Sequence, residues 1–173
     1  MRNKKPLKIF SQIKVIDAGA KGKSVGKAPD GRIIFMKEAI PGDIVDVQVK
    51  KRRKSYYEGK VISIIKESDF RIDPKCSHFQ ICGGCSWQNM EYVKQLDYKQ
   101  KEVQNNLHRI GSIKPNKILP IKKSKKEFFY RNKLEFSFSN SKWLTTKEIQ
   151  LKDIYSDKDA LGFHVPGMWN KVV

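Results

Sequence analysis

Three cysteines are the residues of this chain best placed to do chemistry. Cys76, Cys82 and Cys85 lie in one short segment and are the only cysteines in the sequence. Their C-x5-C-x2-C spacing encloses the glycine pair Gly83-Gly84. Thiolates bind both zinc and iron–sulfur clusters, and either site normally takes four protein ligands. The segment therefore predicts a metal or cluster site of which three ligands are visible.

The spacing leaves zinc and an iron–sulfur cluster open. Structural zinc sites commonly use two C-x2-C pairs, whereas only Cys82 and Cys85 form such a pair, so zinc would recruit His78 or His164. Three cysteines in one loop are typical of cubane clusters, whose fourth ligand comes from elsewhere in the chain. A redox sensor would need an exposed thiol of low pKa, and nothing in the sequence points to one.

The charge of the chain indicates a polyanionic partner. The 173 residues contain 36 Lys and Arg against 18 Asp and Glu, for a formal net charge of +18. A surface of one sign repels itself, and a nucleic acid relieves that repulsion. The alternative is a basic protein with no such partner. Because aromatic residues share the basic stretches, we favour RNA or DNA binding.

One basic run is the best candidate for RNA contact. Five consecutive cations, residues 50–54, end an alternating segment and precede Tyr56 and Tyr57. Such a run is often only a solvated loop, but with tyrosines it could combine phosphate neutralisation with base stacking. The predicted RNA contacts here are Lys51, Arg52, Arg53, Lys54 and Tyr56.

Residues 1–70 predict a small β-barrel. Two segments alternate with the period of a strand and two are apolar runs, and Asp17-Ala-Gly19, Pro29-Asp30-Gly31 and Pro41-Gly42-Asp43 are turn signals. The pattern fits a five-stranded OB-like barrel. The segments that predict strands are 9–15, 32–36, 45–50 and 57–65.

The rest of the chain predicts a loop, one amphipathic helix and further strands. Residues 71–89 hold the cysteines, and 91–110 carries an apolar stripe at helical spacing, with Gly111 as C-cap. Period-two alternation returns from Phe128, and 143–151 and 160–164 also predict strands. The fold class is mainly β (α+β): a barrel domain 1–70, then a partial antiparallel β domain 71–173 that includes the helix. The stripe consists of Val93, Leu96, Val103, Leu107 and Ile110.

The sequence predicts a cytoplasmic protein. No stretch approaches the ~20 apolar residues of a membrane span, and the N-terminus lacks the apolar core of a signal peptide. An odd number of clustered cysteines is a poor disulfide framework, which favours a reducing compartment.

Four motifs, in their order along the chain, give this sequence a resemblance to a known family. They are the barrel with its turn signals, the segment 71–88 (RIDPKCSHFQICGGCSWQ), the segment 129–138 (FYRNKLEFSF) and the segment 161–164 (LGFH). Together they resemble the N-terminal part of SAM-dependent RNA uracil-5-methyltransferases, and most closely the iron–sulfur members that act on 23S ribosomal RNA. The resemblance covers nearly the whole chain.

This resemblance implies a role for each part. Residues 1–70 would be a TRAM domain that binds RNA. The cysteine segment and later strands would form a central domain in which Cys76, Cys82 and Cys85 hold a 4Fe–4S cluster. Arg131 and Lys133 would contact ribosomal RNA, and the helix would pack on the catalytic domain.

The sequence also departs from the family pattern. The family's fourth cluster cysteine would follow Val172-Val173, and the SAM-binding domain with its catalytic cysteine has no counterpart here. We therefore expect a truncated form that keeps RNA recognition, contains no catalytic residue and does not methylate RNA alone. The alternative is a stand-alone RNA-binding module with a zinc-stabilised cysteine loop.

Overall fold

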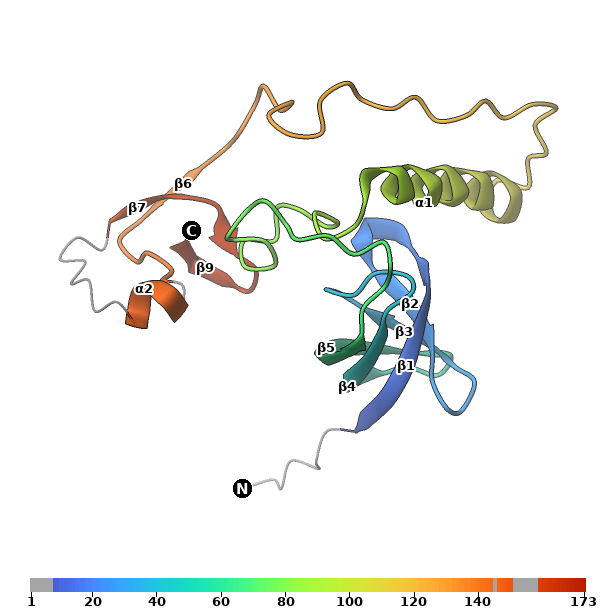
Figure 1. Cartoon of the computed structure of the whole chain (residues 1–173), viewed down its shortest axis with the longest axis horizontal. Helices are drawn as coiled ribbons and strands as arrows, with labels where there is room; N and C mark the ends of the chain where they lie inside the picture. Colours follow the sequence, from blue (N-terminus) through green and yellow to red (C-terminus); the bar gives the residue numbers. More distant parts are fainter. Residues whose placement is uncertain (1–7, 145, 151–158) are drawn as a thin grey trace. The chain divides into compact units, whose positions relative to one another are not determined.

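The computed structural model describes residues 8–144, 146–150 and 159–173, and these form two compact units (Figure 1). One unit comprises Met1–Asp73 and Asn89–Lys125, and the other comprises Pro74–Gln88 and Lys126–Val173. The cysteine segment therefore clusters with the C-terminal part of the chain. The domain boundaries 1–70 and 71–173 stay a prediction.

The first unit is built on a closed five-stranded barrel. Its strands are β1 (Ile9–Ala18), β2 (Ser24–Lys27), β3 (Ile33–Met36), β4 (Ile44–Arg52) and β5 (Tyr56–Lys66). They follow the order β1-β2-β3-β5-β4, and only the β3–β5 pair is parallel, with Ile34 opposite Tyr57. The predicted barrel is thus confirmed.

Alternation places one face of each strand in the barrel core. Along β4, Val45, Val47 and Val49 are buried while the residues between them are partly exposed. Strand β2 lacks this apolar pattern, because Gly26 stands where β1 and β2 approach each other closely. A Cβ at Gly26 would lie 2.6 Å from Cγ2 of Ile13, so only glycine fits the close approach of β1 and β2.

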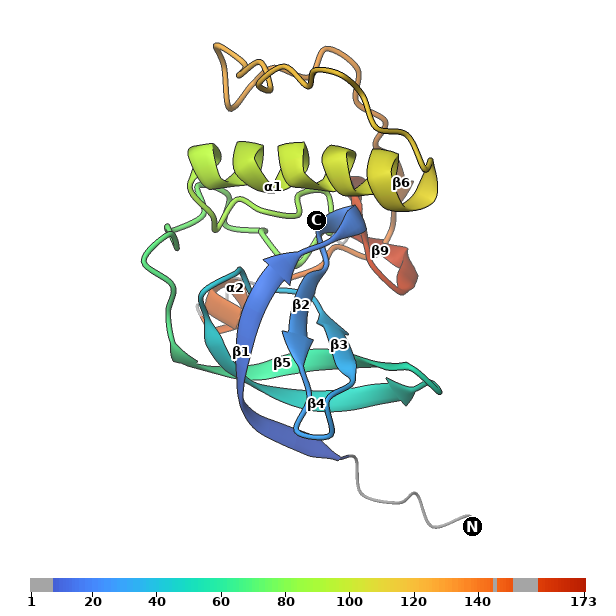
Figure 2. The ribbon, with the colours of Figure 1, turned by 90° about the vertical axis from the view of Figure 1, so that its right-hand side faces the viewer.

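The predicted helix is confirmed as α1 (Tyr92–Asn105), which continues into the π-helical turn η2 (Asn106–Ile110). Gly111 is its C-cap, and its N–H donates to the carbonyl of Asn106 at 2.9 Å. Figures 1 and 2 show α1 beside the barrel, and Lys101 Nζ lies 2.7 Å from an Asp17 carboxylate oxygen at the end of β1. Much of the apolar stripe faces solvent, because Val93, Val103 and Ile110 are all more than half exposed.

Two backbone segments meet where the chain leaves and re-enters the first unit. Arg71 pairs with Met90 in an antiparallel bridge. The Ile72 N–H donates to the Asn89 carbonyl at 3.1 Å, and the Glu91 N–H donates to the Phe70 carbonyl at 3.0 Å. We call this paired segment, residues 70–72 and 89–91, the neck.

The second unit contains short strands and one short helix. Strand β6 (Ser137–Ser139) pairs with β7 (Ala160–Gly162), and β8 (His164–Val165) pairs with β9 (Met168–Val172), both antiparallel. Two expectations were wrong. Residues 128–136 do not form a strand, and Thr146–Gln150, within the expected strand 143–151, is helix α2.

Candidate functional site

The cysteine loop, residues 74–88, lies wholly in the second unit. Cys76 and Cys85 are exposed, Cys82 is half-buried, and all three are free thiols. Short turns shape the segment between them: the Phe79 N–H donates to the Cys76 carbonyl at 3.0 Å, and the Cys82 N–H donates to the His78 carbonyl at 3.2 Å. The loop therefore presents its thiols at an accessible surface.

The two glycines between Cys82 and Cys85 have separate roles. Gly83 has a φ of +69°, and a Cβ there would lie 2.5 Å from Cγ of Pro166. The Gly84 N–H donates to Sγ of Cys82 at 3.4 Å. Gly83 thus permits the turn, and Gly84 supplies the kind of backbone donor that stabilises thiolate ligands.

The Gln88 side chain links the two ends of the cysteine set. Its Nε2 donates to Sγ of Cys85 at 3.2 Å, and its Oε1 accepts from the Cys76 N–H at 3.1 Å. One amide therefore contacts both the first and the last cysteine. Cysteine spacing does not predict this role, although Gln88 is the last residue of the segment 71–88 that contributes to the family resemblance.

The donor chemistry of the loop fits a thiolate-bound metal or cluster, but its thiols are not gathered around one point. Within the described part of the chain, no group of three or more His, Cys, Asp and Glu side chains could hold a metal ion. His78 lies in the loop and His164 in β8, so neither completes such a group. Trp87 is buried, whereas Phe79 and Ile81 are half-buried beside the thiols.

The basic hairpin is an exposed projection of the barrel. Lys51 and Arg52 end β4, Arg53 and Lys54 form the turn, and all four are exposed, whereas Tyr56 at the start of β5 is half-buried. Lys51 has an acidic neighbour, because its Nζ lies 3.9 Å from a Glu58 carboxylate oxygen. The turn is held by the Arg53 N–H, which donates to the Tyr56 carbonyl at 2.9 Å.

The two hairpin tyrosines have different environments. Tyr57 is 1% exposed and its ring packs in the barrel core, so it cannot stack on a base. Its hydroxyl donates to Asp30 Oδ2 at 2.6 Å, and Arg32 Nη2 lies 2.6 Å from the same oxygen. The hydrogen bond from Arg32, then that from Tyr57, holds the pKa of Asp30 well below its usual range, and the bond to Asp30 raises the pKa of Tyr57. This cluster fixes the base of the hairpin.

Tyr56 belongs to an aromatic pair on the outside of the barrel. Its ring meets that of Phe35 edge-to-face at a centroid distance of 5.5 Å. Lys23 Nζ lies 5.8 Å from the Phe35 centroid. Sequence reasoning missed Phe35 and Lys23, because the parallel β3–β5 pairing that brings them beside Tyr56 is a non-local feature.

Arg131 and Lys133 lie in the second unit, separately from the hairpin. Both are exposed on a segment without regular secondary structure. Lys133 Nζ lies 3.2 Å from a Glu135 carboxylate oxygen, and both side chains are more than 80% exposed. This pair is too solvated to neutralise Lys133 strongly.

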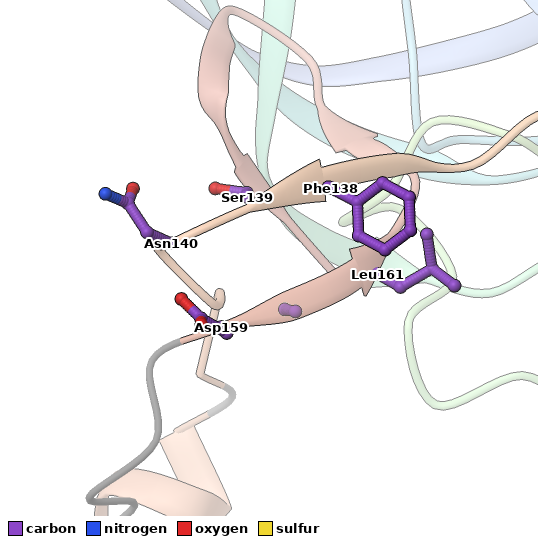
Figure 3. Close-up of a pocket in the computed structure, with 6 residues that line it drawn as sticks. Phe138, Ser139, Asn140, Asp159 and Leu161 are labelled. Atoms are coloured by element: carbon purple, nitrogen blue, oxygen red, sulfur yellow. The ribbon is translucent and has the colours of Figure 1, made fainter.

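A pocket of about 480 Å³ lies between β6 and β7. Figure 3 shows Phe138 and Leu161 side by side at one end, and Asn140 near Asp159 at the other. Phe138, Ser139, Asn140, Asp159, Ala160 and Leu161 line it. None of the predicted site residues is among them.

The barrel can be assigned by comparison with known domains. The profile of the TRAM domain matches residues 12–62, which lie within β1–β5. The barrel is a TRAM domain. The basic hairpin is therefore the β4–β5 hairpin of a TRAM domain, and α1 packs beside that domain in the same unit.

Similarity to known proteins extends beyond the TRAM domain to most of the chain. The chain is 45% identical over 154 residues to an uncharacterized RNA methyltransferase of Bacteroides thetaiotaomicron, covering 89% of this chain and 34% of the relative. An uncharacterized RNA methyltransferase of Porphyromonas gingivalis is 38% identical over 164 residues, covering 93% and 35%. A 23S rRNA (uracil(1939)-C(5))-methyltransferase of Legionella pneumophila is 35% identical over 140 residues, covering 79% and 31%. The chain thus spans about a third of the length of these relatives.

The described helices include none that could cross a membrane, because none is both long and apolar enough.

Proposed function

We propose that this chain is the RNA-recognition part of a SAM-dependent RNA uracil-C5 methyltransferase acting on 23S ribosomal RNA. The observation that carries the proposal is similarity over most of this chain to RNA methyltransferases, one of them a 23S rRNA uracil-C5 enzyme. The TRAM domain and the net charge of +18 support RNA as the partner. We place the protein in the cytoplasm, where its substrate is made and where free thiols persist.

The basic hairpin would provide the electrostatic contact of the TRAM domain. Exposed cations on a projecting β-hairpin can neutralise backbone phosphates without reading sequence. Lys51, Arg52, Arg53 and Lys54 would act in this way, and Tyr56 with Phe35 would offer aromatic surface beside them. In the second unit, Arg131 and Lys133 would add further phosphate contacts.

The cysteine loop would hold a 4Fe–4S cluster through Cys76, Cys82 and Cys85. The supporting observations are accessible free thiols, the Gly84 N–H directed at Cys82, and the Gln88 amide directed at Cys85. Such donors to sulfur accompany iron–sulfur ligation. The fourth ligand would come from outside this chain, and the cluster would order the loop.

Methyl transfer would require the part of the relatives that this chain does not match. The chemistry needs a SAM site and an activated cysteine nucleophile, and we assign neither to the described residues. The exposed apolar stripe of α1 would pack on that catalytic part. This chain alone should therefore bind RNA without methylating it.

Two measurements test the proposal together. The first is anisotropy of labelled 23S rRNA fragments across a salt series, where the chain should bind with a steep salt dependence. The second is iron, sulfide and zinc analysis after anaerobic purification. Absence of RNA binding would refute the proposed function. RNA binding with stoichiometric zinc and no iron would favour the stand-alone, zinc-stabilised module.

A further inference from the structure

A lysine of the cysteine loop lies against two aromatic rings from a distant part of the sequence. Lys75 Nζ lies 5.0 Å from the ring centroid of Phe128 and 4.8 Å from that of Phe129. All three residues belong to the second unit. Because Lys75 directly precedes Cys76, the contact ties the cysteine loop to the segment that leads to Arg131.

The aromatic residues of this contact and the adjacent Tyr130 are exposed to solvent to different degrees. Phe129 is 88% exposed, Tyr130 is 67% exposed, and Phe128 is 38% exposed. Phe129 also has a φ of +55°, a left-handed conformation that few non-glycine residues adopt. The backbone therefore holds an apolar ring in solvent with most of its surface free.

Two cations are associated with this aromatic segment. Lys75 contacts the rings of Phe128 and Phe129 directly, and Arg131 follows Tyr130 in sequence. No acidic side chain of the described residues lies within ion-pair distance of Lys75 or Arg131. Exposed rings beside unneutralised cations are the arrangement with which proteins bind unpaired nucleotides, through base stacking and phosphate attraction.

We propose that Lys75, Phe129, Tyr130 and Arg131 form a stacking platform for an unpaired base of the bound RNA. This inference rests on the proposed RNA-binding function and deepens it by assigning single-stranded RNA to the second unit. A base would stack on the free face of Phe129, while Lys75 and Arg131 attract its flanking phosphates. The cysteine loop would thereby contribute to RNA binding through the placement of Lys75.

Substitution with a matched control tests the platform. The probe is a short fluorescein-labelled oligouridine, titrated with the whole chain at fixed salt. Phe129→Ala should raise the Kd roughly 5- to 140-fold, the range of one lost base stack. Phe138→Ala is the control, because Phe138 is 86% exposed in the same unit, and it should leave the Kd unchanged. Lys75→Gln should weaken binding and lower the salt slope.

A second measurement needs no variant. Ultraviolet crosslinking of the probe to the wild-type chain, followed by peptide mass spectrometry, should identify Phe129 or Tyr130. Wild-type affinity in Phe129→Ala, with crosslinks confined to the barrel hairpin, would overturn the platform but leave the proposed function intact. Failure of the wild-type chain to bind any RNA would overturn both.

Discussion

The guanidinium of Arg71 lies 2.5 Å from the buried carboxylate of Asp43 and ties the neck to the barrel. Asp43 is 0% exposed, and its oxygens also accept the Ile40 N–H at 2.7 Å and the Ser68 N–H at 2.9 Å. Its predecessor Gly42, at φ +98°, makes the turn that directs this carboxylate inward. The Pro-Gly-Asp signal thus encodes an anchor as well as a turn.

Removing one partner of this ion pair should destabilise the first unit strongly. Arg71→Ala leaves the Asp43 charge buried without its cation, which costs about 3–5 kcal/mol in comparable pairs. Urea denaturation followed by circular dichroism measures the loss. Asp97→Ala, which breaks the exposed Lys94–Asp97 pair, is the control and should cost less than about 1 kcal/mol. Equal effects of the two substitutions would contradict the anchoring role.

The Asp30 cluster should give the barrel an acid-sensitive stability. Because Arg32 and Tyr57 lower the pKa of Asp30 in the folded state, the ionised carboxylate stabilises the fold above its unfolded pKa. That contribution is lost as the pH falls below about 3.8 towards the depressed folded value. Asp30→Asn should therefore be less stable than wild type at neutral pH, with a difference that shrinks below pH 4. A difference independent of pH would rule out this role for the charge.

Gln88 should hold the cysteine loop in its observed shape. Gln88→Ala removes the acceptor of the Cys76 N–H and the donor to Cys85 Sγ. Hydrogen–deuterium exchange of the Cys76 amide should then accelerate about 2- to 10-fold, the worth of one hydrogen bond. Gln100→Ala, whose amide donates to the Leu119 carbonyl in the first unit, should leave that exchange rate unchanged.

The same Gln88 variant tests the proposed cofactor. If a reconstituted cluster is present, its visible absorbance should decay faster in air in Gln88→Ala than in wild type, because a donor to a ligand sulfur has been lost. An unchanged decay rate would show that Gln88 orders only the cluster-free loop.

The basic hairpin should account for a defined part of the salt dependence of RNA binding. Replacing Lys51, Arg52 and Arg53 together by alanine should lower the slope of log Kobs against log salt by about 2, at roughly 0.7 for each phosphate contact on single strands. Anisotropy with ribosomal RNA fragments measures this. An equal decrease for a control with the same charge loss on other exposed lysines would assign the effect to net charge instead. The control residues are Lys99, Lys114 and Lys117.

The sequence predicted those parts of the fold that local periodicity determines. Alternation identified β1 and β4, apolar runs identified β3 and β5, and the spacing of apolar residues identified α1. Strand β2 was not predicted, because Ser24 and Gly26 interrupt the apolar pattern. Gly26 nevertheless has a structural role, since it lets β1 and β2 approach closely. Tyr57 shares the inward parity of Val61, so its burial could have been read from the strand period.

Non-local features could not be predicted in this way. The alternation from Phe128 to Phe138 predicts a long strand, but only Ser137–Ser139 finds a partner, in β7. A strand is stable only when it pairs with a neighbouring strand. Alternation within one segment does not show whether such a partner exists. The cysteine spacing found the loop, whereas the Gln88 link and the contact of Lys75 with Phe129 depend on how distant segments meet.

Backbone pairing in the neck holds together the two chain segments that flank the cysteine loop. Since Arg71 and Met90 are bridged, the entropy of closing the chain between them is lost when the first unit folds, whatever the loop contains. Loss of the proposed cluster at Cys76, Cys82 and Cys85 should therefore leave the barrel folded.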